Sequence, residues 1–430
     1  MNKEILRLAI PNILSNITVP LLSSFDTGMM GHLSTAHIGA VGLASMIFNF
    51  IYWNFGFLRM GTTGMTAQAY GRNDAGESGL VLGRAMLVAG AVALVLIVLG
   101  EPLLRAGFYL MNIGAEQQPL VRRYFEIRIW AAPATLASYA FIGWFFGMQN
   151  AVFPLLISVV VNVVNIGLSY YLVFQAGWGI AGVAYGTLWA QYLGFGLAVL
   201  LISLRYRSYL SQVKRHLLLK KDAFLQFLNI NRDIFIRTLF LTFAFAFFHS
   251  QSSLLGKGVL AINVILLNFL NWMSYGVDGF AFATESLVGK YKGAEDEVRL
   301  HKAIRLSFTW GMATALIFSL GYAIFGKALL SVFTTDSGIL NQATSYLFWI
   351  VILPILATPS YIWDGIYIGL TASKSMRNTM VVACVSYILL HYVMVQILGN
   401  HGMWLAFCIF MGMRGILQYG LFRYRKGAVA

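Results

Sequence analysis

The feature of this sequence that most constrains its fold is the length of its stretches without charged residues. Residues 129–204 contain no Asp, Glu, Lys or Arg, and neither do residues 378–413. Hydrophobic residues make up 59% of the chain and charged residues only 11%, whereas about 25% of residues are charged in soluble globular proteins. A water-soluble exterior needs more polar surface than this chain supplies. The composition excludes a soluble enzyme, a disordered chain and a collagen-like chain, and it predicts an all-α integral membrane protein.

The same stretches predict how many helices cross the membrane. A membrane-spanning helix needs roughly 20 consecutive apolar residues, so the 76 residues of 129–204 hold the end of one helix and two further helices. Glycine- and proline-containing turns divide the remaining stretches in the same way. Twelve transmembrane helices are predicted, over residues 6–31, 36–69, 80–100, 120–146, 151–174, 178–204, 224–252, 256–287, 303–325, 339–369, 378–397 and 401–423.

The net charge of +14 comes from 30 Lys and Arg against 16 Asp and Glu. In a soluble protein this excess would suggest a nucleic-acid partner. Here the basic residues lie between apolar runs, in alternate connections and at both ends of the chain, where they set the membrane topology. We therefore expect both termini in the cytoplasm, a basic cytoplasmic linker at 205–223, and no nucleic-acid partner.

An internal repeat divides the expected helices into an N-terminal six-helix lobe, 1–204, and a C-terminal six-helix lobe, 224–430. The matched pairs include Gly71 with Gly289, Arg72 with Lys290 and Arg84 with Lys302 at a separation of 218 residues, and Gly143 with Gly365 and Gly147 with Gly369 at a separation of 222. Since six is an even number, both bundles insert in the same direction and form a parallel repeat. Two similar bundles with a cleft between them favour a transporter that works by alternating access.

Four carboxylates lie inside the expected spans, where a charged side chain costs at least about 2.5 kcal/mol and is by default a functional candidate. They are Asp26, Asp278, Glu285 and Asp364. The alternative is that they neutralise arginines at the same depth, which are Arg59, Arg128, Arg237 and Arg414.

The surroundings of these carboxylates in the sequence separate them. Asp26 has no basic neighbour, which favours a role in proton or cation coupling. For Asp278 and Asp364 coupling and neutralisation both stay open. Glu285 precedes the basic end of its helix, so a structural charge is favoured there, and the same role is expected for Arg59 and Arg128.

Polar residues on three helices share one face each. The spacing of 3, 4, 3 and 7 residues gives the helix over 256–287 a continuous polar face made of Asn268, Asn271, Tyr275, Asp278 and Glu285. The other two faces consist of Tyr361, Asp364 and Tyr367, and of Asn162, Asn165 and Ser169. Because polar faces avoid lipid, they predict a wet central cavity that binds substrate. No His, Cys and carboxylate cluster has metal-ligand spacing, so neither a metal nor a cofactor beyond the coupling ion is expected.

Several stretches of the chain resemble the multidrug and toxic compound extrusion (MATE) transporters, in particular their DinF-type branch. The matching stretches are Phe25–Gly28, Leu58–Gly71, Ile127–Pro133, Leu266–Leu270, Ser274–Ala281, Glu285–Gly289, Trp363–Gly369 and Met376–Asn378. The resemblance covers nearly the whole chain and implies twelve helices in two lobes, as the helix count does. It also implies cation-coupled efflux, usually by proton entry, of small organic and often cationic compounds across a bacterial plasma membrane.

The resemblance also implies roles for individual residues. Asp26 matches the usual proton carrier of the first helix, and Asn165 matches an asparagine of the fifth helix. Some relatives carry a second aspartate where this chain has Ser169, so Asn165, Ser169 and desolvation are expected to tune Asp26 instead. Pro20 is the expected bend in the first helix. The expected coupling ion is H⁺, with Na⁺ kept open, and we expect a monomer in contact with membrane lipids.

Two other functions stay open at this point. A flippase for lipid-linked oligosaccharides, of the same broader superfamily, would use Arg59, Arg128 and Arg237 to bind a pyrophosphate, although the acidic face of the helix over 256–287 argues against it. An integral membrane enzyme acting on lipids would need a motif such as His-x-x-x-x-Asp or a carboxylate pair that binds magnesium. The sequence contains neither, and its cytoplasmic loops are short.

Overall fold

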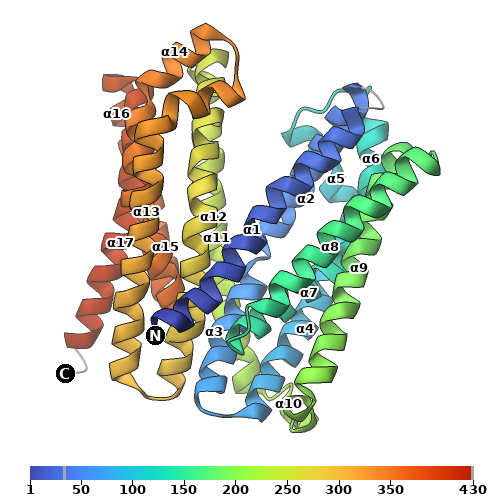
Figure 1. Ribbon diagram of the computed structural model, residues 1–430, viewed down its shortest axis with the longest axis vertical. Helices are drawn as coiled ribbons and strands as arrows, with labels where there is room; N and C mark the ends of the chain where they lie inside the picture. Colours follow the sequence, from blue (N-terminus) through green and yellow to red (C-terminus); the bar gives the residue numbers. More distant parts are fainter. Residues whose placement is uncertain (32–34, 428–430) are drawn as a thin grey trace. The chain divides into compact units, whose positions relative to one another are not determined.

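The computed structural model describes residues 1–31 and 35–427, without the side chains of residues 19–24, 26–28, 30–31, 35–36, 215 and 425–427. Within these residues every regular element is a helix and no strand occurs (Figure 1), as predicted. The elements are α1 (Asn2–Gly31), α2 (Thr35–Asn54), α3 (Phe57–Gly71), α4 (Ala75–Val98), α5 (Gly100–Leu110), α6 (Gln118–Arg128), η1 (Ile129–Ala131), α7 (Ala132–Gly147), α8 (Val152–Tyr170), η2 (Tyr171–Gln175), α9 (Gly179–Arg205), α10 (Arg207–Ser211), η3 (Arg215–Leu217), α11 (Lys221–Leu254), α12 (Lys257–Gly293), α13 (Glu297–Phe333), α14 (Ser337–Ser345), α15 (Leu347–Gly369), α16 (Ser373–Leu398) and α17 (Asn400–Gly427).

The helices have the lengths that a bilayer requires. Within the described residues, eleven helical segments are long and apolar enough to cross a membrane. α1 adds a helix of 30 residues, which at about 1.5 Å per residue is also long enough to cross. Each of the twelve predicted spans thus corresponds to a helical segment of the structure.

Some predicted spans consist of two consecutive helices. The span predicted over 36–69 contains α2 and α3, separated by a turn in which the N–H of Gly56 donates to the carbonyl of Trp53, 3.2 Å away. The span predicted over 120–146 contains α6 and α7, joined by the tighter helix η1. Pro133 explains this junction, because it has no N–H to donate to a carbonyl one turn earlier.

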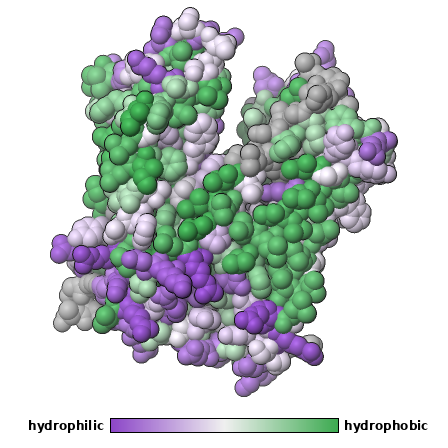
Figure 2. Space-filling view, viewed as in Figure 1, coloured by the Kyte–Doolittle hydropathy of each residue, from purple (hydrophilic) through white to green (hydrophobic). Residues whose placement is uncertain are grey.

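By their internal contacts the helices form two compact units. The first unit contains Leu14–Leu228, and the second contains Met1–Ile13 together with the chain from Asn229 onward. Glu4 shows why the start of the chain belongs to the second unit, since its carboxylate accepts hydrogen bonds from Lys290 at 3.1 Å and from Tyr291 at 3.0 Å. In Figure 2 the visible face of each unit is apolar along much of its helices and hydrophilic at helix ends, which suits a bilayer.

The predicted linker, 205–223, is folded against α4 of the first unit. It contains α10 and η3. The buried guanidinium of Arg84 donates to the carbonyls of Leu217 and Leu218, each 3.2 Å away, and to Glu77 at 2.7 Å. One arginine of α4 therefore holds the backbone of the connection between the two halves of the sequence. The division into 1–204, 205–223 and 224–430 stays a prediction.

The backbone repeats between the two halves at a constant separation of 222 residues. Asn73 after α3 has a φ of 57°, and Glu295 after α12 has a φ of 56°. The next residue caps the following helix in both halves, because Asp74 accepts from the N–H of Glu77 and Asp296 from the N–H of Arg299, both at 2.8 Å. The turns after α7 and α15 match in the same way, with left-handed residues at Gln149 and Thr371.

Glycine contacts obey the same separation. A Cβ atom on Gly143 of α7 would meet the carbonyl oxygen of Arg59, and a Cβ atom on Gly365 of α15 would meet that of Ala281. Both glycines let two helix backbones approach closely. The separation of 218 predicted for the pairs from Gly71 to Arg84 is therefore wrong. The error is four residues, about one helical turn, which leaves the matched residues on the same helix face.

Candidate functional site

The centre of the charged site in the second unit is Asp364 on α15. One of its carboxylate oxygens accepts hydrogen bonds from Arg237 of α11 and, at 2.7 Å, from Arg414 of α17. The other oxygen accepts from the side-chain amide of Gln418 at 2.7 Å. The exposed fractions of Asp364, Arg237 and Arg414 are only 6%, 7% and 2%. Asp364 thus neutralises two buried arginines and ties three helices together.

Two further predicted residues extend this site to α12. Tyr361 lies one turn before Asp364 and interacts electrostatically with Asp278 as well as with Asp364 and both arginines. Asp278 in turn interacts with Tyr275, one turn earlier on α12. We call this set of residues the second-unit cluster: Arg237, Tyr275, Asp278, Tyr361, Asp364, Arg414 and Gln418. The structure therefore brings Asp278 and Asp364 to a common polar region, and its two aspartates balance its two arginines in charge.

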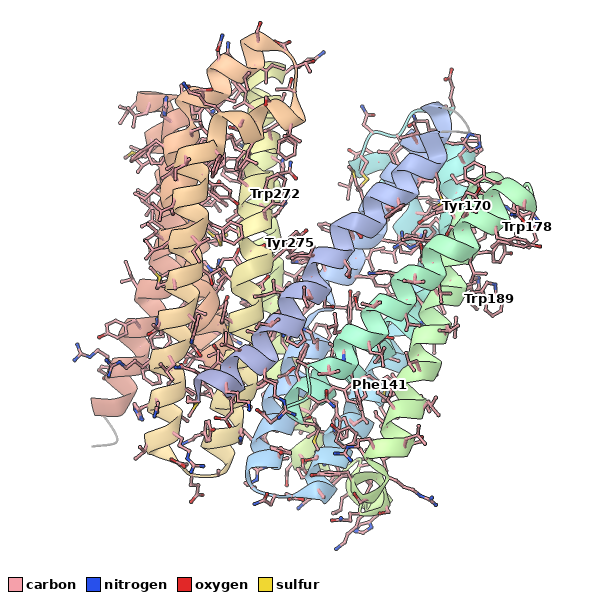
Figure 3. All side chains as sticks on the ribbon, viewed as in Figure 1. Phe141, Tyr170, Trp178, Trp189, Trp272 and Tyr275 are labelled. Atoms are coloured by element: carbon pink, nitrogen blue, oxygen red, sulfur yellow. The ribbon has the colours of Figure 1, made fainter. Side chains whose placement is uncertain are left out.

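The predicted polar face of α12 is the side that its own unit leaves partly uncovered. Asn271 is exposed, whereas Asn268, Tyr275 and Asp278 are half-buried. The apolar residues between them, such as Met273, point into the core of the unit. Figure 3 labels Trp272 and Tyr275 along this helix. α12 can therefore present polar side chains to water without exposing its apolar face.

Tyr367 and Glu285 differ from the other members of the predicted polar faces because both are buried. The hydroxyl of Tyr367 donates to the backbone carbonyl of Gln418 at 2.8 Å. Tyr367 does not line an open surface, which contradicts its predicted position in a substrate cavity. The physical reason is that its face of α15 packs against α17 and not against water. The structural role of Glu285 stays a prediction.

A second, uncharged site lies in the first unit between α8 and α9. The side-chain amide of Asn165 donates to the hydroxyl of Thr187 at 2.9 Å, and Thr187 donates to the carbonyl of Val183 at 3.0 Å. Asn165 is 1% exposed and Ser169 is fully buried. Within the described residues, the amide oxygen of Asn165 and the hydroxyl of Ser169 have no hydrogen-bond partner. Buried polar atoms of this kind usually bind a side chain, water or a ligand.

This uncharged site lies on the face of α8 that contacts α1. The hydroxyl of Ser158 lies 3.2 Å from the hydroxyl of Thr18 on α1. Asn165 and Ser169 follow Ser158 by about two and three helical turns, so all three share one face of α8. The two helices run side by side in the same direction (Figure 1).

Asp26 and Pro20 belong to α1, but their side chains lie outside the described residues. The coupling role of Asp26 and the bend at Pro20 therefore stay predictions. Asn162, the remaining polar residue predicted on α8, is half-buried.

Aromatic rings surround Arg128 of the first unit. Its guanidinium donates to the hydroxyl of Tyr124 at 2.9 Å and lies 4.9 Å from the centroid of the Phe48 ring. These contacts stabilise a buried cation through the faces of the rings. The other predicted structural charge, Arg59, supplies the carbonyl that Gly143 approaches.

Sequence reasoning missed Gln418 and Thr187. Gln418 follows Arg414 by four residues, so the two share a helix face, and this spacing was a usable signal. Thr187 has no periodic polar companion on α9, and only its contact with Asn165 reveals it. A buried network in the second unit was also missed, in which Asn263 donates to Asn400 at 2.8 Å and accepts from Trp404 at 2.8 Å.

Comparison with known proteins decides the family. The family model described as MatE matches residues 11–171 and 234–397, which is most of the chain. The chain belongs to the MatE family. It is 33% identical over 431 residues to the DNA damage-inducible protein F of Escherichia coli (strain K12), with 99% of this chain and 93% of that protein covered.

Solved structures agree with the MatE assignment. A crystal structure of MATE in the bent conformation matches with a TM-score of 0.92 at 19% identity, over 99% of this chain and 96% of that one. An outward-facing multidrug resistance MATE family transporter of the MOP superfamily matches with a TM-score of 0.90 at 19% identity, with the same coverage. At these identities the likeness shows the fold alone. Family and fold together make the chain a multi-pass membrane transporter for multidrug and toxic-compound efflux, and not an enzyme.

Proposed function

We propose that this transporter exports small organic, often cationic, compounds across a bacterial plasma membrane in exchange for protons. Asp26 carries the coupling proton, and Na⁺ is the alternative ion that the experiment below distinguishes. Both termini lie in the cytoplasm, the monomer is the transporting unit, and no cofactor other than the coupling ion takes part.

The observation that carries the proposal is the uncharged site in the first unit. Asn165 and Ser169 hold buried oxygen atoms with no partner among the described residues, on the face of α8 that contacts α1. α1 is also the helix that carries Asp26. Neutral hydrogen-bonding groups suit a carboxyl group that alternates between its protonated and ionised forms, because they can serve both forms.

The second-unit cluster supports the same choice by contrast. A proton carrier must lose its charge during the cycle. If Asp364 took a proton, Arg237 and Arg414 would be left as two buried cations without compensation, which is costly. We therefore assign Asp364 to charge neutralisation and keep Asp278 as the second candidate for coupling.

The mechanism follows from electrostatics. Ionised Asp26 attracts a cationic compound, whereas protonated Asp26 lets it leave and lets the bundle change conformation. One charge that crosses a potential of 100 mV supplies about 2.3 kcal/mol, a concentration ratio of roughly fifty. This drives export against a gradient.

The flippase considered above is not proposed. Arg237 is bonded to Asp364, and Arg128 lies among aromatic rings. Neither guanidinium is thus arranged as an open site for a pyrophosphate.

The test measures dye efflux from proteoliposomes under an imposed pH gradient or an imposed Na⁺ gradient. We expect Asp26→Asn to abolish efflux driven by the pH gradient, because the amide cannot take up and release a proton. Asp26→Glu should keep partial activity with a shifted pH profile. The matched control is Asp222→Asn, which removes an exposed aspartate in the first turn of α11 and should transport normally.

Two outcomes would change the proposal. Wild-type efflux by Asp26→Asn would move the coupling site to Asp278, which Asp278→Asn then tests. Efflux that follows only the Na⁺ gradient would replace the proton by sodium.

A further inference from the structure

A groove of about 470 Å³ lies on the second unit between α13, α15 and α17. Its lining is Ile304, Phe308, Trp363, Tyr419, Phe422 and Arg423. The ring of Trp363 forms its floor, with ring centroids 5.4 Å from Phe308 and 5.1 Å from Phe422. Ligand sites usually measure about 300–1,000 Å³, so the groove has room for a molecule or for a large part of one.

The groove has one cationic side. Arg423 is exposed, and its guanidinium lies 5.7 Å from the centroid of the Tyr419 ring. Lys302 and Arg305, which flank Ile304 on α13, are exposed as well. None of the six lining residues is acidic. The groove therefore combines an apolar aromatic floor with positive charge at its mouth.

The surroundings of the groove are those of a lipid-facing surface. Further along α13, Ile317, Leu320 and Ile324 are all exposed. In a membrane protein such a face lies against acyl chains. Basic residues beside a span attract anionic headgroups. A molecule with an acyl chain and a negatively charged phosphate matches both parts of the groove.

We propose that this groove binds one anionic phospholipid, with an acyl chain along Trp363 and the phosphate at Arg423. The proposal is independent of the coupling ion and of the exported compound.

The site lies directly behind the second-unit cluster. Trp363 precedes Asp364 on α15, and its ring centroid is 6.1 Å from that of Tyr367. Tyr367 in turn bonds Gln418 on α17. A bound lipid would therefore pack against the contact between α15 and α17 that holds the buried charges, and it would stabilise that contact.

The experiment uses the full-length protein in phosphatidylcholine nanodiscs with increasing fractions of brominated phosphatidylglycerol. Bromine quenches nearby tryptophans, and the signal of Trp363 is the difference between the wild type and Trp363→Phe. We expect this signal to be quenched at a low fraction of brominated phosphatidylglycerol. Arg423→Gln should require about a fivefold higher fraction, the factor expected for one basic residue near an anionic surface.

Two variants separate the groove from general charge. Lys374→Gln removes one exposed positive charge elsewhere on the second unit and should behave as the wild type. Ile304→Phe fills the groove without changing charge and should weaken the quenching, while unchanged thermal unfolding shows that the variant is folded. Equal quenching of Trp363 by brominated phosphatidylcholine, or quenching by brominated phosphatidylglycerol that is unaffected by Arg423→Gln, would overturn the proposal and leave only ordinary lipid contact.

Discussion

The two halves of this transporter share a backbone framework but differ in their buried polar chemistry. At the separation of 222 residues, Asn165 of α8 corresponds to Tyr387 of α16, and Asp364 of α15 corresponds to Ile142 of α7. Asn165 takes part in a hydrogen bond to α9, whereas Tyr387 packs against aromatic rings, among them Phe410 at 5.2 Å. Each half therefore buries polar groups where the other buries apolar ones.

The difference teaches which features of a duplicated bundle are constrained. Gly143 and Gly365 keep the same close contact with a neighbouring backbone because any side chain there would collide with a carbonyl. Hydrogen bonds and ion pairs depend only on side chains, so they can change in one half without moving the helices. The neutral site of the first unit and the charged cluster of the second unit are such changes.

The largest expected effect breaks the charged side of this comparison. Asp364→Asn leaves Arg237 and Arg414 buried without a counter-charge, so we expect the free energy of unfolding to fall by about 3–5 kcal/mol. Ile142→Val at the corresponding position of the first unit should cost only about 0.5–1.5 kcal/mol. Thermal unfolding in detergent measures both variants. Adding Arg414→Gln to Asp364→Asn should recover part of the loss, and an undiminished midpoint for Asp364→Asn would refute the structural role of the cluster.

The next effect tests the shared framework itself. Gly143→Ala and Gly365→Ala should each lower the free energy of unfolding by about 1–3 kcal/mol, since a methyl group there meets a backbone carbonyl. Gly90→Ala and Gly321→Ala are the controls, because a methyl group at either position would have no atom of the described neighbouring residues within 4 Å. These controls should be neutral or stabilising by about 0.5–1 kcal/mol. A loss in one half only would argue against equivalent packing.

A smaller effect compares the corresponding residues Asn165 and Tyr387. Asn165→Ala removes the bond to Thr187 and should cost about 0.5–1.5 kcal/mol of unfolding free energy. Tyr387→Phe should cost almost nothing, because its hydroxyl has no partner among the described residues. Unfolding of the two variants side by side provides the measurement. A similar cost for both would mean that the two sites are equally polar in practice.

The smallest effect concerns an ion pair found in the first half, where the corresponding residue of the second half is Ala323. Hydrogen bonds from Arg122 and Arg105 lower the pKa of the Glu101 carboxyl to about 2, from an ordinary value of 4.5. Because the folded-state pKa is lowered, the stabilisation is present above pH 4.5 and is lost as the pH falls toward 2. Glu101→Gln should therefore differ from the wild type at pH 6 and approach it at pH 3 in thermal unfolding.

The difference at Glu101 should be small at every pH and should shrink further in high salt, because the pair is exposed. A difference between variant and wild type that grows as the pH falls would contradict the assignment.

The sequence by itself determined the class of protein and the positions of its helices. Bilayer thickness imposes a length on every span regardless of what packs around it, so charge-free stretches identified the spans without tertiary information. Periodicity also showed which polar residues share a helix face, as for the face of α12. The repeat was visible in the sequence, but its register was misjudged by one helical turn, because neighbouring turns place similar residues on the same face.

Only the tertiary structure decided which faces meet. Asp364 was recognisable as a buried carboxylate, yet its partners Arg237 and Arg414 lie 127 and 50 residues away in the chain. Thr187 and Tyr367 likewise obtained their roles from the neighbouring helix and not from their own. Helical periodicity orients a side chain within one helix, whereas pairing between helices depends on how close their backbones approach, which the glycine contacts of the folded bundle set.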